Sequence, residues 1–433
     1  MLCFLFRDIR LVCGVALKVI YLHQYFNSPQ MAGGTRSYEM ARRLVAAGHE
    51  VHMVTSWRND DGRSPKWFVT DESGIKTHWL PVPYSNHMSY CERIVAFFRF
   101  AFLAMSKATE LGGDVIFATS TPLTIAIPAV LASRKKKIPM VFEVRDLWPE
   151  LPIAMGALRN PVLRWLAHRL ERWAYKNAEA VVALSPGMKD GIVNTGYPAN
   201  RVAVIPNSSD NAEFAYAQEA AAKFRAARDW LGERPLLVYG GTFGRINGVG
   251  YMVELAKELL TVNPDVRILL VGDGQEKGIV RKQAEQAGVL GTNLFIEDSL
   301  PKNQMPALLS AADMASSLFI DLPEMQPNSA NKFFDALASG TPIMLNYGGW
   351  MHDLVDGKMC GLAMWRKPVS EVARIVAGRI TDRQWLKAAG AAARSLAESE
   401  FDRDKLAVQF AEVIAKSTIR QGQFAEHIAP GHY

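Results

Sequence analysis

The sequence is poor in cysteine and lacks the cysteine patterns that hold small folds together. Four cysteines occur among 433 residues, and they lie far apart at Cys3, Cys13, Cys91 and Cys360. No CxxC pair and no His/Cys cluster has the spacing of a zinc site. We therefore expect free thiols in a reducing compartment rather than a disulfide framework.

Long apolar runs are also missing. No run reaches the roughly 18 apolar residues that a membrane-spanning helix needs. The first residues are apolar, but Arg7, Asp8 and Arg10 interrupt them and no clear cleavage site follows. We predict that residues 1–17 form an N-terminal extension or arm rather than a signal peptide.

Signatures of nucleic-acid and dinucleotide binding are absent as well. No helix-turn-helix, zinc or RNP pattern occurs, and no G-x-G-x-x-G follows a predicted strand. These absences argue against a nucleic-acid partner and against an NAD-dependent dehydrogenase. Charge is uneven: residues 1–207 carry 25 Lys+Arg and 16 Asp+Glu, a balance of +9, and the other residues carry 24 and 27, a balance of −3. We expect the basic half to meet an anionic partner.

Short apolar stretches alternate with helical patterns along the chain. This alternation predicts parallel, doubly wound sheets, and it restarts after a break near residue 208. The predicted fold is α/β, with two facing Rossmann-like domains, parallel sheets and a cleft between them. The predicted parts are a first domain over 18–207, a second domain over 208–400, and a closing helix with a loose tail over 401–433.

Two segments of the first domain carry candidate chemistry. Gly33, Gly34 and Thr35 lie between a predicted strand and helix, where glycines allow close approach and a helix N-terminus favours an anion. An ordinary turn explains them equally well. Arg145 and Asp146 directly follow an apolar strand. We interpret them as catalytic candidates at the strand's carboxyl end, although a structural ion pair is an equal alternative.

The second domain holds two glycine-rich turns after predicted strands. The first contains Gly241, Thr242 and Gly244, with Arg245 beside them as a cation. Such a loop can wrap a phosphate group. The second turn contains Gly272 and Gly274, which permit close backbone approach to a ligand or serve the turn alone.

The most specific segment is PNSANKFFDALASG, a polar loop followed by a helix that ends at Gly340. A lysine near a helix N-terminus can hold a diphosphate, and a carboxylate one turn later can accept both hydroxyls of a ribose. An exposed ion pair is the simpler alternative. The donor-binding candidates in this segment are Asn328, Ser329, Ala330, Asn331, Lys332 and Asp335.

A further candidate is membrane contact. Residues 90–108 are apolar and aromatic with interspersed cations, which is typical of an interfacial helix. The basic run at 134–137 would add attraction to anionic lipid. The alternative is a buried core helix and a solvated charge run.

The order of these motifs resembles a known family. The segments GGTRSYEMARRLVAAGHEVHMVTS, RDLWPE, LSPGMKDGIV, VIPN and NKFFDALASGTP, taken in sequence, are similar to retaining glycosyltransferase family 4, which has the GT-B fold. The resemblance covers roughly residues 18–415. Within that family the chain looks most like the bacterial O-antigen and capsule enzymes described as N-acetyl-L-fucosaminyltransferases.

The resemblance implies a donor site and a reaction. The first domain would bind the acceptor and the second a UDP-sugar donor, with retention of configuration and without a metal or cofactor. The family's diphosphate-binding cations match Arg245 and Lys332, but Asn247 stands where the family usually has a second lysine. Its ribose-binding glutamate matches Asp335, and its other glutamate would fall at Pro327, so backbone N–H groups at 328–330 would replace it.

The implied function is transfer of a sugar, such as N-acetyl-L-fucosamine, to a lipid-linked saccharide. That reaction would serve O-antigen, capsule or lipopolysaccharide synthesis at the inner face of the bacterial cytoplasmic membrane. Asp146 is our candidate for assisting the acceptor. A sugar-nucleotide epimerase or hydrolase of the same architecture, and a non-catalytic nucleotide-sugar-binding protein, stay open as alternatives.

Overall fold

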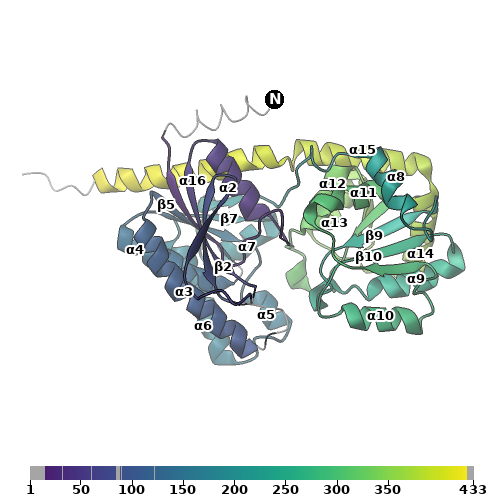
Figure 1. Ribbon diagram of the computed structural model, residues 1–433, viewed down its shortest axis with the longest axis horizontal. Helices are drawn as coiled ribbons and strands as arrows, with labels where there is room; N and C mark the ends of the chain where they lie inside the picture. The colour runs from purple at the N-terminus through teal and green to yellow at the C-terminus, as the bar shows by residue number, and fades with distance from the viewer. Residues whose placement is uncertain are drawn as a thin grey trace, which may run out of the picture. The chain divides into compact units, whose positions relative to one another are not determined.

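The computed structural model describes residues 15–31, 33–59, 61–83, 88, 90–120 and 122–426. The chain forms two compact units, each a sheet with helices against it (Figure 1). The first unit contains 35–206 together with the C-terminal helix, and the second contains 207–403 together with the short segment 29–34. The division at Pro206 and Asn207 lies one residue from the predicted boundary.

The first unit is built on an eight-stranded sheet with the order β3-β4-β2-β1-β5-β6-β7-β8. Neighbouring strands are parallel, except that β3 runs antiparallel to β4 at one edge. The strands are β1 (Lys18–Leu22), β2 (Glu50–Trp57), β3 (Phe68–Glu72), β4 (Ile75–Pro81), β5 (Val115–Thr119), β6 (Met140–Val144), β7 (Ala180–Ala183) and β8 (Val202–Val204).

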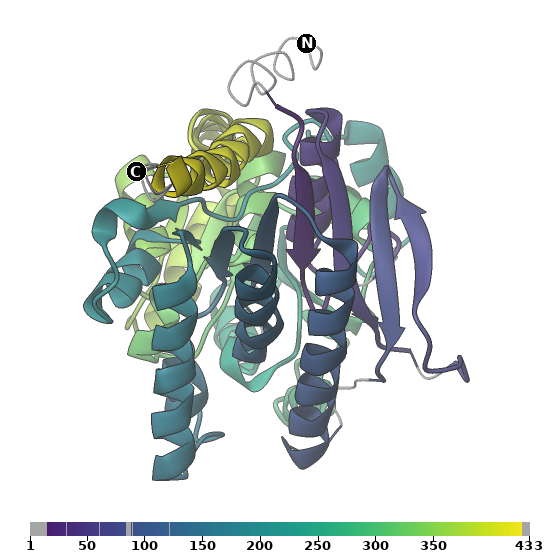
Figure 2. The same cartoon turned by 90° about the vertical axis from the view of Figure 1, so that its left-hand side faces the viewer.

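Helices connect these strands in the βαβ manner. They are α2 (Arg36–Ala46), α3 (Tyr90–Leu111), α4 (Ala126–Lys136), α5 (Glu150–Ala154), α6 (Pro161–Asn177) and α7 (Pro186–Asn194), with short 3₁₀ turns η1 (Leu123–Ile125) and η2 (Ala199–Arg201). Helix α2 ends just before Gly48, whose φ of 97° is the left-handed conformation predicted for a helix stop. Figure 2 shows α3, α4 and α6 side by side over one face of the sheet.

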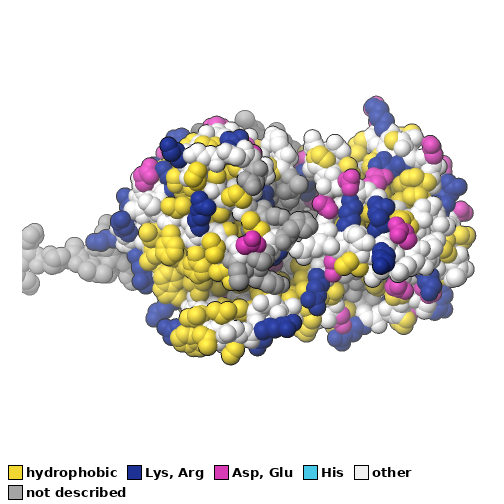
Figure 3. Space-filling view, turned by 60° about the horizontal axis from the view of Figure 1, so that its bottom comes forward, with side chains coloured by type: hydrophobic (Ala, Val, Ile, Leu, Met, Phe, Trp, Pro, Cys, Tyr) yellow, Lys and Arg dark blue, Asp and Glu magenta, His cyan; other side chains and the backbone are white. Residues whose placement is uncertain are grey.

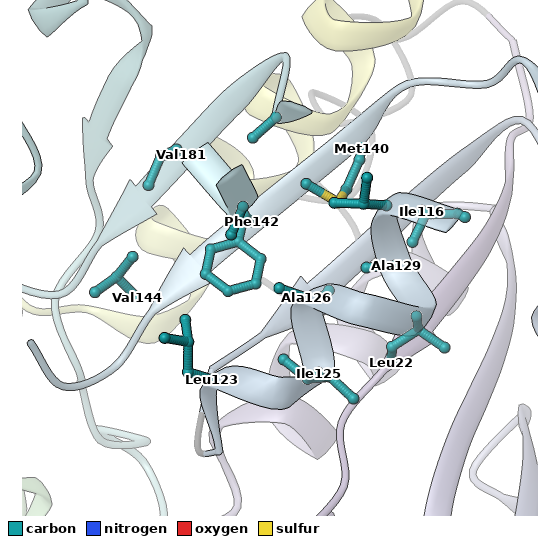
Figure 4. Packing of buried hydrophobic residues seen from close by; sticks show 14 of the residues in the cluster. Leu22, Ile116, Leu123, Ile125, Ala126, Ala129, Met140, Phe142, Val144 and Val181 are labelled. Carbon is teal, nitrogen blue, oxygen red and sulfur yellow. The ribbon is translucent and has the colours of Figure 1, made fainter. Parts of the chain in front are cut away.

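The core of the first unit lies between that sheet face and these helices. Strands buried on both faces read as continuous apolar runs, which explains why β1, β5 and β6 contain almost no polar side chain. Phe142 and Met140 of β6 pack against Leu123, Ile125 and the small residues of α4 (Figure 4).

The C-terminal helix α16 (Arg403–Glu426) covers part of the first unit. The Phe410 ring lies 4.7 Å from the Phe117 ring and 6.5 Å from the Tyr21 ring. The predicted closing helix therefore packs on the unit that begins the chain. It continues to Glu426, although the sequence predicts a loose tail over 420–433. The rest of that tail, 427–433, and most of the predicted N-terminal extension lie outside the described residues.

The second unit has a six-stranded, fully parallel sheet with the order β11-β10-β9-β12-β13-β14. Its strands are β9 (Leu236–Gly240), β10 (Arg267–Val271), β11 (Leu294–Glu297), β12 (Met314–Ser317), β13 (Ile343–Leu345) and β14 (Gly361–Ala363). Its helices are α8 (Gln218–Ala226), α9 (Tyr251–Val262), α10 (Lys277–Gln286), α11 (Met305–Ala311), α12 (Asn331–Ser339), α13 (Trp350–Lys358), α14 (Val369–Thr381) and α15 (Arg383–Ser399), with turns η3 (Arg245–Asn247), η4 (Lys302–Gln304) and η5 (Pro323–Met325).

The two parallel sheets and the doubly wound order confirm the predicted α/β class. The hairpin of β3 and β4 was not predicted, because β3 is a short, half-exposed edge strand with little apolar signal. Cys360 is a buried free thiol. Cys3 and Cys13, and the side chain of Cys91, lie outside the described part of the chain.

Candidate functional site

The sheet of the second unit reverses its winding between β9 and β12, its two central strands. Open α/β sheets bind ligands at the carboxyl ends of the strands on either side of such a point. Here those ends lead into the loop 241–244 after β9 and into Phe319 after β12. Two predicted segments, the first glycine loop and the start of α12, meet at this place.

Lys332 is the cation at this point. Its Nζ donates to the Tyr239 hydroxyl at 3.2 Å and lies 4.6 Å from the centre of the Tyr239 ring and 5.6 Å from that of Phe319. Enclosure by these rings lowers the pKa of Lys332 to about 8, because burial penalises the charged form. No acid pairs with this ammonium group in the described part of the chain, so an anionic ligand would be its counter-ion.

Gly241 allows the lysine to come this close to the loop. A Cβ at Gly241 would lie 3.1 Å from Lys332 Cε and 3.2 Å from its Nζ. The group that approaches Gly241 within the protein is therefore the side chain of Lys332, and the predicted wrapping of a phosphate by this loop stays a prediction.

Asp335 is buried and does not pair with Lys332. One carboxylate oxygen accepts from Ser209 Oγ at 2.8 Å and the other accepts from Lys302 Nζ at 2.5 Å. This arrangement contradicts the alternative of an exposed pair between Lys332 and Asp335. Each carboxylate oxygen can accept more than one hydrogen bond, so the group keeps capacity for a ligand hydroxyl.

Lys302 was missed by sequence reasoning. It lies on η4, where the sequence PKNQMP contains no recognisable motif. Its ammonium group also lies 4.6 Å from the Phe214 ring. No local signal could have linked Lys302 to Asp335, because the contact joins elements 33 residues apart.

The second glycine turn serves contact between two loops. A Cβ at Gly272 would lie 1.8 Å from the Gly241 carbonyl oxygen, and one at Gly274 would lie 2.6 Å from that of Phe243. The N–H groups of Gly241 and Phe243 donate to Val271 and Asp273 at 2.9 Å. These two donors are therefore used within the protein, and the glycines 272 and 274 make the loop packing possible.

The remaining loop residues are more exposed. The Thr242 carbonyl accepts from the Tyr239 hydroxyl at 2.7 Å, which fixes the loop above β9. A Cβ at Gly244 would lie 3.2 Å from Asn247 Oδ1. Arg245 follows on the surface, and within the described residues its guanidinium has no ion-pair or hydrogen-bond partner. Arg245 can therefore turn toward an anion.

The residues before α12 hold its N-terminus in place. The Ser329 carbonyl accepts from Asn207 Nδ2 at 2.5 Å, and the Asn328 carbonyl accepts from Trp350 Nε1 at 2.7 Å. Ala330 is the N-cap residue and supplies no side-chain cap. The first N–H groups of the helix, at Asn331 and Lys332, are of the kind that a helix leaves without internal partners. They add to the positive potential around Lys332 Nζ.

The first unit reverses its winding between β1 and β5. His23 and Gln24 follow β1, and Arg145 follows β6. Arg145 Nη1 lies 3.4 Å from His23 Nε2, and the Arg145 N–H donates to Ser120 Oγ at 2.9 Å. Burial, with the cations Arg145 and Arg58, holds the pKa of His23 well below its usual range. The imidazole is therefore neutral near pH 7.

Polar groups at this point have no partners in the described part of the chain. These are His23 Nδ1 and both amide atoms of Gln24, which are buried. Buried polar groups are normally hydrogen-bonded, so this carboxyl edge offers a neutral imidazole and an amide to a ligand. Sequence reasoning missed both, although polar residues directly after a buried strand were the signal that identified Arg145 and Asp146. Asp146 lies beside Arg145 and is half-buried.

The segment around Gly33 passes from one unit to the other. Gly33 has a φ of 128°, and residues 29–34 group with the second unit, whereas Thr35 belongs to the first, where it holds the N-cap position of α2 without a side-chain cap. The next residue, Arg36, is buried: its Nε donates to Glu143 at 2.9 Å, and its Nη2 donates to the Ile205 carbonyl at 2.9 Å. Arg36 therefore anchors α2 to the sheet, a structural role that sequence reasoning missed.

One group of side chains in the described residues has the geometry to hold a metal ion. It consists of Glu150, His168 and Glu171, whose ligand atoms lie within 4.8 Å of one another. The group lies on α5 and α6 of the first unit, whereas Lys332 and Asp335 belong to the second. The absence of a catalytic metal stays a prediction.

Solved structures share this fold. A structure of Anabaena HepE in complex with UDP-glucose matches with a TM-score of 0.70 at 18% identity, over 92% of this chain and all of that one. The fold is that of the GT-B glycosyltransferases.

Sequence comparison is more specific. Residues 32–208 match the family described as glycosyl transferase 4-like domain. WcaI of Escherichia coli K12, assigned to colanic acid biosynthesis as a glycosyl transferase, is 25% identical over 301 residues, 66% of this chain and 73% of WcaI. The alpha-monoglucosyldiacylglycerol synthase of Streptococcus pneumoniae R6 is 23% identical over 354 residues, 79% of this chain and 74% of the synthase. The chain is therefore similar in sequence to glycosyltransferases, most directly over residues 32–208, and it has the GT-B fold.

In the described part of the chain, no helix combines the length and apolar character needed to cross a bilayer.

Proposed function

We propose that the protein transfers a sugar from a UDP-sugar to a lipid-linked saccharide, with retention of configuration and without a metal ion. The part of the proposal that concerns the donor rests on Lys332, an ammonium group at the switch point of the second sheet that has no acidic partner among the described residues. Asp335 lies one turn later on the same helix and would accept ribose hydroxyls. HepE, of similar fold, is known with UDP-glucose bound.

The proposed chemistry follows from where charge develops. When the bond between the sugar and the diphosphate breaks, positive charge grows on the sugar and negative charge on the departing diphosphate. Lys332, Arg245 and the first N–H groups of α12 would stabilise that negative charge. Since removal of one such contact typically costs about two to three orders of magnitude in rate, these groups can supply a large part of the acceleration.

The part of the proposal that concerns the acceptor depends on residues of the first unit. Arg145, Asp146 and the neutral His23 lie at or next to the carboxyl ends of its central strands. We assign them to orienting the acceptor hydroxyl, with Asp146 assisting its deprotonation. In the front-face reaction proposed for the family, the departing phosphate helps to remove this proton, so no carboxylate nucleophile is required.

A lipid-linked acceptor agrees with the basic charge of residues 1–207 and with the synthase that the chain resembles, whose name includes a diacylglycerol. The relative WcaI is assigned to the biosynthesis of colanic acid, a polysaccharide. We therefore place the reaction in bacterial surface-polysaccharide synthesis, O-antigen or capsule, at the inner face of the cytoplasmic membrane. A donor such as UDP-N-acetyl-L-fucosamine follows from the resemblance in sequence.

The test is UDP release by the purified protein across a panel of UDP-sugars, with and without a polyprenyl-diphosphate-linked saccharide. Release from one donor that requires the acceptor is the expected result. Acceptor-independent release would indicate a hydrolase, and conversion of the donor without release would indicate an epimerase. UDP binding without turnover on any pair would favour a non-catalytic binding protein.

Variants then connect the activity to the site. Lys332→Ala and Asp335→Ala should each weaken donor use, and Lys282→Ala on the exposed side of α10 is the matched control for loss of a lysine. Unchanged donor kinetics in both site variants would overturn the assignment of α12.

A further inference from the structure

Two helices of the first unit expose large apolar side chains. Five of the exposed large hydrophobic residues lie on α3 and four on α6. In Figure 3 hydrophobic side chains gather on one face of this unit, with Lys and Arg beside them. We use the name two-helix apolar surface for Ile94, Phe98 and Phe102 of α3 together with Leu163, Trp165 and Leu166 of α6.

Helix α3 is apolar on the side that faces away from the core. Its packed side carries one fully buried ring, that of Phe100, and otherwise the small residues Ala96, Ala101, Ala104 and Ala108. Its outer side carries Phe98 and Phe102, whose rings stack at 6.5 Å. A helix that faced only water would have the larger apolar side chains inside, so the outer face of α3 has the composition of a contact surface.

The topology places both parts of the surface at one edge of the unit. Helix α3 follows β4 and precedes the parallel β5, so it begins at the carboxyl edge of the sheet and runs back. Helix α6 lies between β6 and β7 and runs the same way. The exposed apolar residues of α6 lie at 162–166, in its first turns, and those of α3 lie at 94–103, from its second turn to just past its middle. The surface therefore begins near the edge that carries Arg145 and Asp146 and extends away from it along α3. Figure 2 shows α3 and α6 extending past the shorter α4 between them.

The charged residues next to the two-helix apolar surface indicate which kind of partner it would bind. Arg99 on α3 and Arg169 on α6 are exposed next to the apolar residues, and the Arg169 guanidinium lies 5.1 Å from the centre of the Trp165 ring. The one acid of α6, Glu171, is buried. An aromatic and aliphatic surface with cations and few exposed acids complements anionic lipid headgroups over an acyl region.

The structure also revises the predicted membrane contact. The basic run 134–137 ends α4 at the amino edge of the sheet, away from the apolar residues of α3. Helix α6, which no sequence pattern indicated, takes the place of that run in the surface.

We propose that the two-helix apolar surface docks the first unit on an anionic lipid bilayer and so brings the acceptor edge of its sheet to the membrane. This inference rests on the proposed lipid-linked acceptor. The bilayer contact itself does not depend on catalysis and can be measured without a sugar donor.

The test is co-sedimentation of the full chain with vesicles of phosphatidylglycerol and phosphatidylethanolamine, compared with phosphatidylcholine alone. The protein should bind the anionic vesicles, and added salt should weaken that binding. Combining Phe98→Ser with Phe102→Ser, or Trp165→Ser with Leu166→Ser, should lower the partition coefficient about tenfold or more. Ile279→Ser is the control, because Ile279 of the second unit is 57% exposed, close to the 58% of Phe102.

Three outcomes would overturn the proposal: no binding of the wild type to anionic vesicles, equal binding by both double variants, or concentration-dependent self-association that the same substitutions abolish. The last result would identify a contact between copies of the chain. UDP release from a detergent-dispersed acceptor separates this inference from the proposed function. The double variants should keep that release and lose it on vesicles, whereas failure of the proposed function would remove release from every form of the protein.

Discussion

The pKa of Lys332 leads to a distinctive dependence of UDP affinity on pH. Enclosure by the rings of Tyr239 and Phe319 lowers this pKa to about 8. The lysine is then about nine-tenths charged at pH 7 and about one-tenth charged at pH 9. A diphosphate binds the charged form and raises the pKa in the complex. UDP affinity should therefore fall about tenfold between pH 7 and pH 9, a range in which the terminal phosphate of UDP, with a pKa of about 6, stays ionised.

The size of the effect follows from the loss of a charge-assisted hydrogen bond. Such a bond contributes about 1.5–3 kcal/mol, which corresponds to roughly 10- to 150-fold in affinity. Lys332→Met should weaken UDP binding by that factor at pH 7 and give a flat profile, because no titrating group remains. Lys332→Arg keeps its charge throughout and should also be flat.

Isothermal titration calorimetry of UDP against each protein across this range is the measurement. A wild-type profile without a break, or the same break in Lys332→Met, would refute the assignment of Lys332 as the group that binds the diphosphate.

Three further predictions concern stability. Arg36→Ala leaves Glu143 buried and unpaired, so it should cost about 3–5 kcal/mol in the free energy of unfolding of the first unit; urea denaturation measures this, and a cost below about 1 kcal/mol would contradict the anchoring role. Gly272→Ala places a Cβ 1.8 Å from the Gly241 carbonyl oxygen and should lower the melting temperature by several degrees and weaken UDP binding, whereas Gly278→Ala, with open space around it, should do neither. Burial, and secondarily Glu150, raises the pKa of Glu171 to about 8. The folded state therefore keeps a proton that the unfolded state loses near its ordinary pKa of about 4.5, so stability should fall as pH rises from about 5 to about 8. Thermal melts should show a shallower fall for Glu171→Gln, and equal slopes would argue against a protonated Glu171.

Sequence reasoning was most successful where a local pattern has one physical meaning. Short apolar runs predicted β9 and β10, because a strand buried on both faces needs apolar side chains on both sides. Gly340, with a φ of 66°, ends α12 as predicted, since few other residues adopt that conformation at a helix stop. Lys332 was identified because the loop and helix around it form a recognisable segment.

The same reasoning could not assign partners. Lys332 and Asp335 are three residues apart, and spacing alone allows them to pair, but the fold places Tyr239 beside one and Lys302 beside the other. Glycines 272 and 274 indicated that some group approaches the backbone closely, but not which one. In the structure that group is the backbone of the loop 241–243. His23 and Gln24 directly follow a buried strand, which is the signal that identified Arg145 and Asp146, but they belong to no recognisable motif and were therefore missed.

The sequence by itself determined the class of this protein: two α/β units, the strands that build them, and the segments that hold the candidate donor site. These follow from periodicity and from turn chemistry, which act over a few residues. Only the tertiary structure decided that α16 packs on the first unit, that Lys302 holds Asp335, and that α3 and α6 both expose large apolar side chains. Those contacts join residues far apart in the chain, and their geometry is set by the packing of whole elements against the sheets.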